Sequence, residues 1–301
     1  MYDQVAQNKR RSFVLTFVFM VLVAAVISAV LYLFDFGLVG VVIAAVIAGG
    51  SAFASYWKSD AIALRMSRAV EADPSTYARL HNLVEGLCIA SGLPKPRIYV
   101  IDDDAPNAFA TGRNPKHAAI AVTTGLLDKM DRVELEAVLA HELSHIKNDD
   151  ILVSTLAVTM VGLITLIGDF SIRMMWWNGG RRGRGDREGG SAPWLGFIGL
   201  GILVLSPVLA RLMQFAVSRR RESLADVSAI EMTRYPPGMI AALEKLRDDA
   251  TVVHASSRAT AHLWIEAPVA RVEEEGRLSK WNRLFDTHPP IEDRIAALRE
   301  L

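Results

Sequence analysis

Long uncharged apolar runs are the dominant pattern along the chain. Residues 13–34 and 36–57 contain no charged side chain, and only Asp35 separates them. Each run, as an α-helix of about 22 residues, would measure about 33 Å, enough to cross the hydrocarbon core of a bilayer. The pattern therefore predicts a transmembrane helical hairpin. A cleaved signal peptide is the competing account of the first run, but the run's length and the second run close behind it argue against one.

The residues that flank this hairpin are basic: Lys9, Arg10 and Arg11 before it, and Lys58, Arg65 and Arg68 after it. The positive-inside rule then places both ends of the hairpin in the cytoplasm. The bulk of the chain follows on that side.

Two further apolar runs cover residues 151–168 and 192–210 and are of borderline length for a span. A Gly- and Arg-rich segment separates them. If both runs cross the bilayer, this basic loop lies outside, against the charge bias. If they do not, they form an apolar hairpin that is buried in protein or dips into the membrane. We favour crossing, because the loop is short and Asp186 and Glu188 partly offset its charge.

Elsewhere the spacing of apolar positions predicts a soluble part with many helices and a small sheet. The expected elements are a helical region over 61–92, a strand over 97–103, a hairpin with strands over 108–111 and 118–122, and helices over 131–148, up to 234, from 236 and from 289. Asp131 is the predicted N-cap of the helix over 131–148. The fold class that follows is α+β, in a mainly helical integral membrane protein.

The composition agrees with a chain that is part membrane-embedded and part soluble, and it limits the classes of partner that are expected. Apolar residues make up 51% of the 301 residues, and the mean hydropathy is +0.25. Basic and acidic residues number 33 each, so nothing favours a nucleic-acid partner. The single cysteine, Cys88, excludes an intramolecular disulfide and fits a reducing compartment. It lies in an apolar helical stretch, which predicts a buried structural thiol.

The sequence "HELSH" at residues 141–145 is the strongest candidate for chemistry. On a helix, His141 and His145 leave the same face one turn apart, and two imidazoles suit zinc. Glu142 lies beside them, where a carboxylate can take a proton from an attacking water. Such a pattern arises by chance in roughly one chain in a hundred. The alternative is a pair of surface histidines on an amphipathic helix.

A catalytic zinc site needs a third protein ligand, and "RRRESLAD" offers one. Glu222 is the candidate ligand. Asp226, four residues later on the same helix face, can accept the free ring N–H of a ligating histidine. The alternative for Glu222 is a surface ion pair with one of the three arginines before it.

"HELSHIKNDD", "RRRESLAD" and "FDTHPPIEDRI", with the apolar hairpin, resemble the HtpX-type membrane zinc metalloproteases, relatives of the prenyl-protein (CAAX) endopeptidases. The resemblance covers nearly the whole chain and implies a gluzincin with one Zn²⁺. It implies His141, His145 and Glu222 as ligands, Glu142 as general base and Asp226 as the partner of a ligand. The implied parts are a hairpin (1–58), a first protease segment (59–150), a second hairpin with its loop (151–215) and a second protease segment (216–301).

Two further assignments stay open. Asn107, Ala108 and Phe109 resemble the family's edge strand, which binds substrate backbone by strand addition, although an ordinary hairpin is the alternative. His288 in "THPP" is a candidate proton donor to the oxyanion, or else a packed turn residue. Arg294 is expected to make a structural ion pair.

The implied function is an integral endopeptidase of a bacterial-type inner membrane. Its protease domain would face the cytoplasm and hydrolyse misfolded or damaged membrane proteins, with membrane quality-control proteins as partners. A dedicated processing peptidase of the prenyl-protein type is the first alternative. A non-catalytic zinc-binding adaptor is the second, and Glu142 argues against it because a structural site needs no base.

Overall fold

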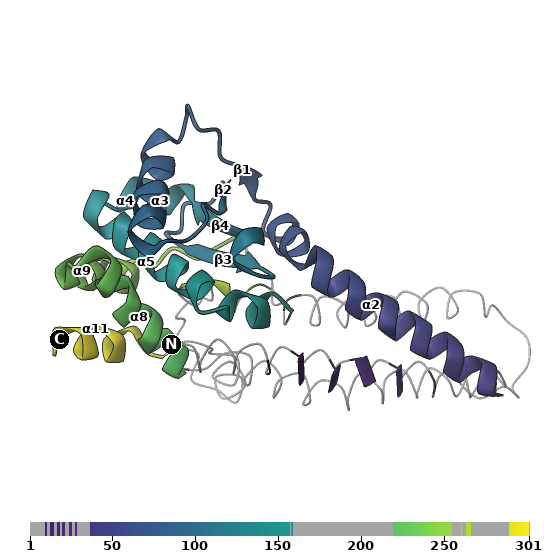
Figure 1. Cartoon of the computed structure of the whole chain (residues 1–301). Helices are drawn as coiled ribbons and strands as arrows, with labels where there is room; N and C mark the ends of the chain where they lie inside the picture. The colour runs from purple at the N-terminus through teal and green to yellow at the C-terminus, as the bar shows by residue number, and fades with distance from the viewer. Residues whose placement is uncertain are drawn as a thin grey trace, which may run out of the picture.

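The structure is a computed structural model, and it describes residues 37–156, 158, 219–254, 260, 263–265 and 289–300, with isolated positions between 10 and 28. In Figure 1, a body of helices around a small sheet carries one long helix that projects from it. This α+β architecture, mainly helical with a small sheet, confirms the predicted fold class of the soluble part.

The sheet has four strands in the order β1-β2-β4-β3. β1 (Val70–Glu71) is antiparallel to β2 (Arg97–Ile101), β2 is parallel to β4 (Ala118–Thr123), and β3 (Ala108–Gly112) is antiparallel to β4. The predicted hairpin is therefore present, and a 3₁₀ turn, η1 (Pro115–His117), joins its strands. β3 forms one edge of the sheet.

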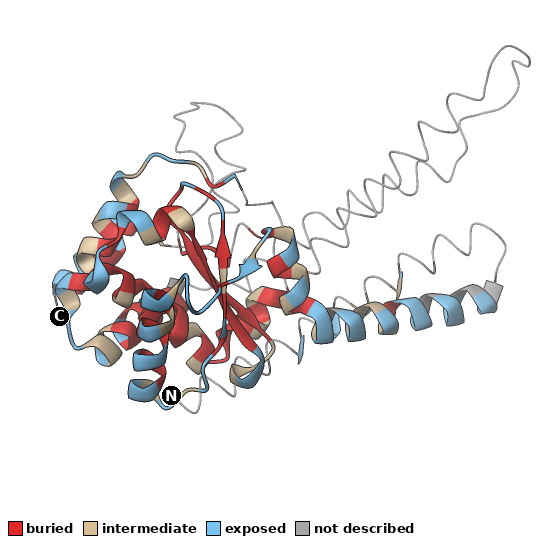
Figure 2. Ribbon diagram, turned by 90° about the horizontal axis from the view of Figure 1, so that it is seen from above, coloured by how far each residue is buried: buried red, intermediate tan, exposed pale blue. Residues whose placement is uncertain are grey.

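Both faces of β3 and β4 are buried, because helices cover one face and a second apolar cluster covers the other (Figure 2). Ala108, Ala110, Ile120 and Val122 face the main core, whereas Phe109, Ala119 and Ala121 face the second cluster. This alternation is that of a strand, in which successive side chains point to opposite faces. Small alanines on both faces let the covering elements approach closely.

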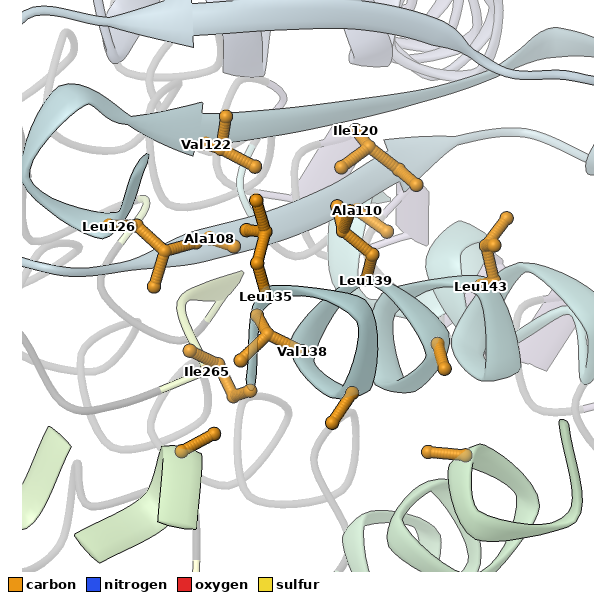
Figure 3. Packing of buried hydrophobic residues seen from close by; sticks show 14 of the residues in the cluster. Ala108, Ala110, Ile120, Val122, Leu126, Leu135, Val138, Leu139, Leu143 and Ile265 are labelled. Carbon is orange, nitrogen blue, oxygen red and sulfur yellow. The ribbon is translucent and has the colours of Figure 1, made fainter. Parts of the chain in front are cut away.

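The main core forms around α5 (Arg132–Lys147), which is buried along most of its length. Leu135, Val138, Leu139 and Leu143 pack beneath Ala108, Ala110, Ile120 and Val122 of the sheet (Figure 3). Truncation of one such fully buried leucine to alanine costs about 2–5 kcal/mol, so this packing fixes the helix firmly against the sheet.

A capping box begins α5 at the residue that the sequence predicts. Asp131 accepts from the backbone N–H groups of Val133 and Glu134, at 2.8 and 2.9 Å, and Glu134 accepts from the backbone N–H of Asp131 at 2.8 Å. These contacts satisfy N–H groups that would lack partners at a helix N-terminus.

Three more helices, α3 (Ala78–Ser91), α8 (Arg219–Thr233) and α9 (Pro236–Asp248), pack against α5. α4 (Thr124–Lys129) follows β4, and α11 (Ile291–Arg299) packs against α8 and α9. α9 begins with two prolines in its first turn, as predicted. α9 lies against the start of α5, where Gly238 meets Val133, whereas α8 reaches the two histidines near the end of α5.

The long helix α2 (Gly37–Met66) begins within one residue of the second apolar run but continues nine residues past its end at Trp57. The extension is explained by Ala63 and Leu64, which are buried in the second cluster beside the sheet. The part of α2 that projects from the body exposes large apolar side chains, among them Leu38, Val39, Val42 and Phe53 (Figure 2).

Among the described residues, no single helix meets the length and hydropathy expected of a membrane span. Two parts of α2, Val41–Ser51 and Tyr56–Met66, meet that test only as a pair joined across a 63° bend. The predicted runs 13–34, 151–168 and 192–210 lie largely outside the described residues, as does the Gly- and Arg-rich segment.

The prediction of one helical region over 61–92 is wrong in its middle. Met66 ends α2, the short strand β1 follows, and α3 starts only at Ala78. The break has a local cause in "DPST", because Asp73 accepts from the backbone N–H groups of Ser75 and Thr76 at 3.1 and 2.8 Å, forming a turn around Pro74. Proline and a side chain that bonds the backbone both compete with a helix.

Candidate metal centre

His141 and His145 lie on the last turns of α5, where the helix packs against α8. Their Nε2 atoms are 3.1 Å apart, and their rings lie nearly perpendicular, at 84°. His141 is fully buried, whereas the side chain of His145 is 16% exposed. The pair therefore points inward, and it does not lie on a solvated surface.

Glu222, in the first turn of α8, completes a three-residue group with the two histidines. Its Oε2 atom lies 3.6 Å from Nε2 of His141, and its Oε1 atom lies 3.7 Å from Nε2 of His145. Glu222 is 5% exposed, so its position is not that of a solvated surface ion pair. Of the arginines before it, Arg221 lies instead 3.6 Å from Asp150.

These distances fit a metal ion. Ligand atoms at zinc distances of about 2.0–2.2 Å, in a tetrahedral arrangement, lie about 3.3–3.6 Å from one another. The two Nε2 atoms are 3.1 Å apart, and the two oxygens of Glu222 lie 3.6 and 3.7 Å from them, one oxygen facing each nitrogen. One ligand atom from each of the three residues lies within 4.8 Å of the other two, close enough to hold one ion after small adjustments. Two imidazoles and one carboxylate leave a fourth position open, which distinguishes a catalytic from a structural site.

The outer nitrogen of each histidine faces a buried carboxylate. Nδ1 of His141 lies 2.9 Å from Oδ1 of Asp226, and Nδ1 of His145 lies 3.3 Å from Oδ2 of Asp150. The contact of His145 is a hydrogen bond, whereas that of His141 is a close ion contact without hydrogen-bond alignment. A carboxylate beside Nδ1 favours the proton on that nitrogen, which leaves Nε2 with its lone pair toward the ion. Asp226 therefore lies where the sequence predicted a partner for a ligand.

Charge at the site is dominated by these carboxylates. Burial by itself would lower the pKa of His141, but the contacts with Asp226 and Glu222 raise it to about 9. Burial would raise the pKa of Asp226, but Arg294 and His141 lower it to about 2. Without a metal, protons on the imidazoles balance the negative charge, and a divalent cation can take over that role.

Glu142 is 2% exposed and follows the first ligand on α5. A turn of about 100° per residue places it beside the ligands instead of among them. Burial by itself would lower the pKa of Arg294, but the charges of Asp226, Glu222 and Glu142 raise it. A buried carboxylate that follows a ligand on the same helix is the kind of group that can act as a general base.

β3 passes over α5 with its outer edge turned away from β4. Along that edge, the carbonyl of Ala108 accepts from the N–H of Ile265 at 3.0 Å, and the N–H of Gly112 donates to Thr155 at 3.1 Å. Between them, within the described part of the chain, the outward backbone groups of Ala110 have no hydrogen-bond partner. Asn107 bonds Thr123 and the N–H of Ala108, and Phe109 packs against Trp264.

The structure thus brings His141, Glu142, His145, Glu222 and Asp226 together, and it places the residues around Ala108 at a sheet edge. His288 lies outside the described residues. The sequence interpretation gave no role to Asp150, although "HIKNDD" contains it five residues after His145. It expected an ion pair for Arg294 but did not identify the partner.

Residues 74–301 match the sequence profile of Peptidase family M48. The chain belongs to this family. It is 40% identical over 301 residues to a Protease HtpX homolog of Thermoanaerobacter pseudethanolicus, covering 100% of this chain and 98% of the relative. A Protease HtpX homolog of Streptococcus uberis is 41% identical, with both chains covered completely.

A solved structure, Ste24p of S. mikatae, resembles this M48 chain in fold alone, with a TM-score of 0.50 and 16% identity over 99% of this chain and 67% of that one. The family assignment confirms the resemblance inferred from the motifs. Together with the histidine–glutamate cluster, it identifies the protein as a metalloprotease.

Proposed function

We propose that this M48 metalloprotease is a zinc endopeptidase of the cell membrane, with its active site on the cytoplasmic side. The observation that carries the proposal is the convergence of His141, His145 and Glu222 beside the buried Glu142. Two nitrogens and one oxygen form a donor set that zinc prefers, and a neighbouring base suits hydrolysis.

In this proposal, His141, His145 and Glu222 would hold the ion, which would supply Lewis-acid polarisation of the scissile carbonyl and lower the pKa of water. Glu142 takes the proton from the attacking water and then delivers it to the leaving amine. Asp226 and Asp150 keep the imidazole rings in place. His288 remains a candidate donor to the oxyanion.

Substrate backbone would add to the outer edge of β3. Strand addition uses main-chain hydrogen bonds, and the outward N–H and C=O groups of Ala110, which have no partner among the described residues, offer two. Asn107, Ala108 and Phe109 would then act mainly by holding that edge in position, because their own groups have partners within the protein.

Membrane proteins that are misfolded or damaged are the proposed substrates. The exposed apolar side chains of α2 support contact with a lipid bilayer, since a soluble surface rarely carries so many together. Membrane quality-control proteins are the proposed partners. The balanced numbers of basic and acidic residues give no reason to propose nucleic acid as a further partner.

Zinc content and casein cleavage by the full chain in detergent test the proposal. We expect Glu142→Gln to retain about one zinc and to lose activity by about 10²–10⁴-fold, because only the base is changed. His141→Ala should lose the metal itself. Normal cleavage by Glu142→Gln would refute the assignment of the base.

A dedicated processing peptidase is the second candidate function, because the HtpX-type proteases that the motifs resemble are related to the prenyl-protein proteases. Proteins captured by the inactive Glu142→Gln chain in cells distinguish the two. Many unrelated membrane proteins would support quality control, whereas one prenylated substrate would support processing.

A further inference from the structure

Arg294 is a buried cation that no proposed chemical step uses. It lies on α11 and is only 3% exposed. A guanidinium removed from water destabilises the fold unless its donors are satisfied. The groups that accept hydrogen bonds from Arg294 therefore indicate the role of this residue.

Asp226 receives two of its hydrogen bonds. Nε of Arg294 donates to Oδ2 at 2.8 Å, and Nη2 donates to Oδ1 at 2.6 Å. This bidentate contact fixes the plane of the carboxylate, which a lysine with a single point of contact does not do. Oδ1 is also the atom that lies 2.9 Å from Nδ1 of His141. The orientation of a metal ligand thus depends, at one remove, on Arg294.

Nη1 of the same guanidinium donates to the backbone carbonyl of Ile265 at 3.2 Å. The N–H of Ile265 donates in turn to the carbonyl of Ala108, on the outer edge of β3. Figure 3 shows the side chain of Ile265 beneath this strand, near Leu135 and Val138. Next to Ile265, the fully buried Trp264 packs edge-on against Phe109 of β3 at 4.9 Å.

We propose that Arg294 is a positioning residue that holds His141 and the edge strand β3 in fixed relation to each other. This inference rests on the proposed function, because it matters to catalysis only if the cluster binds metal and β3 binds substrate. The guanidinium of Arg294, carried by α11, bonds two other segments that are distant in the sequence: α8 and the segment around Ile265. Within the described residues, it joins the proposed ligand shell to the proposed substrate edge.

The test compares wild type, Arg294→Lys and the control Arg299→Lys, as full chains in detergent. Arg299 lies on the same helix, but its 2.6 Å bond to Glu244 is exposed. Three quantities are measured: zinc affinity, the visible spectrum after cobalt substitution, and kcat and KM separately on a peptide. A residue that only stabilises the fold would change none of these in the folded protein.

For Arg294→Lys we expect an altered cobalt spectrum, because the ring of His141 is less constrained. Zinc affinity should fall, but by less than the roughly 10–100-fold that loss of the ligand's own partner causes, because Asp226 itself is kept. KM should rise as the edge strand shifts. Arg299→Lys should match the wild type in all three. A folded Arg294→Lys protein with wild-type spectrum, affinity and KM would overturn the proposal.

If Arg294→Lys does not fold, Arg294→Gln replaces it, because its amide can still donate one hydrogen bond to Asp226 but cannot make the bidentate contact. The same spectral and kinetic changes are expected. Failure of both variants to fold would assign Arg294 a structural role and overturn the proposal. Failure of the proposed function looks different, because then the wild type itself neither binds zinc nor cleaves peptide.

Discussion

Cys88 lies on the inner face of α3 and is 5% exposed. Burial raises the pKa of its thiol above the ordinary value. Because the thiolate is the reactive form, we expect alkylation of the native protein at pH 8 to be at least about 10-fold slower than after unfolding in guanidinium. The stability gained from the neutral thiol is complete below the unfolded pKa and is lost as the pH rises through the folded pKa.

Rates of alkylation across pH 7 to 10, by mass spectrometry of intact protein, measure this effect. Cys88 is the only cysteine, so every adduct reports on it. Equal rates for native and unfolded protein would show that α3 does not bury the thiol as described.

The roles of some single residues could be predicted from the sequence, and those of others could not. His141 and His145 were predictable because helix geometry places residues four apart on one face. Asp226 is four residues from Glu222 and followed in the same way. The bond between Arg294 and Asp226 joins residues 68 apart, and only the packing of α11 on α8 brings them together.

Gly112, which ends β3, illustrates a constraint at the level of a structural element. Its φ is +141°, and a Cβ atom there would lie 2.4 Å from the backbone oxygen of His117. We expect Gly112→Ala to reduce the free energy of unfolding by more than about 1 kcal/mol, since neither the backbone angle nor the contact can be relieved cheaply. Chemical denaturation of the detergent-solubilised chain measures the change.

Gly86→Ala is the matched control for this substitution. Gly86 lies inside α3, and a Cβ atom there meets nothing within 4 Å. Alanine in a helix interior is favoured over glycine, so this variant should gain up to about 1 kcal/mol. If Gly112→Ala and Gly86→Ala lowered the free energy of unfolding equally, the backbone angle and close contact at Gly112 would not explain the loss of stability.

Element boundaries were predictable where the signal was local. The capping box at Asp131 and the two prolines of α9 marked their helix starts correctly. The interruption of 61–92 was missed although "DPST" is a local turn signal, and the strand before it gave no signal, because β1 is only two residues long and is defined by pairing with β2, nearly 30 residues later. Register between strands is a property of tertiary contact, which periodicity alone does not report.

At the scale of the whole molecule, the proposed metal centre joins two helices that are far apart in the sequence. Glu222 follows His145 by 77 residues, yet α5 and α8 pack side by side (Figure 1). The motif "RRRESLAD" predicted Glu222 as the third ligand, but the sequence did not place either helix against the sheet. An ion held by both helices belongs to the native arrangement, because the unfolded chain does not bring the three ligands together.

Removal of the metal should therefore lower the thermal stability of the whole molecule. A ligand present at 100 times its Kd stabilises the native state by about 2.7 kcal/mol, which corresponds to roughly 5–10 °C in Tm for a protein of this size. We expect a chelator to lower the Tm of the wild type by this amount and added zinc to restore it. Differential scanning fluorimetry in detergent measures both changes.

Two variants separate the metal centre from other effects of the chelator. Glu142→Gln keeps all three ligands, so its Tm should fall as much as that of the wild type, and its lack of activity excludes self-cleavage as the cause. His141→Ala lacks a ligand, so the chelator should leave its Tm unchanged. An equal drop in His141→Ala would mean that the stabilising ion binds elsewhere, and the contact between α5 and α8 would then have to be explained by packing alone.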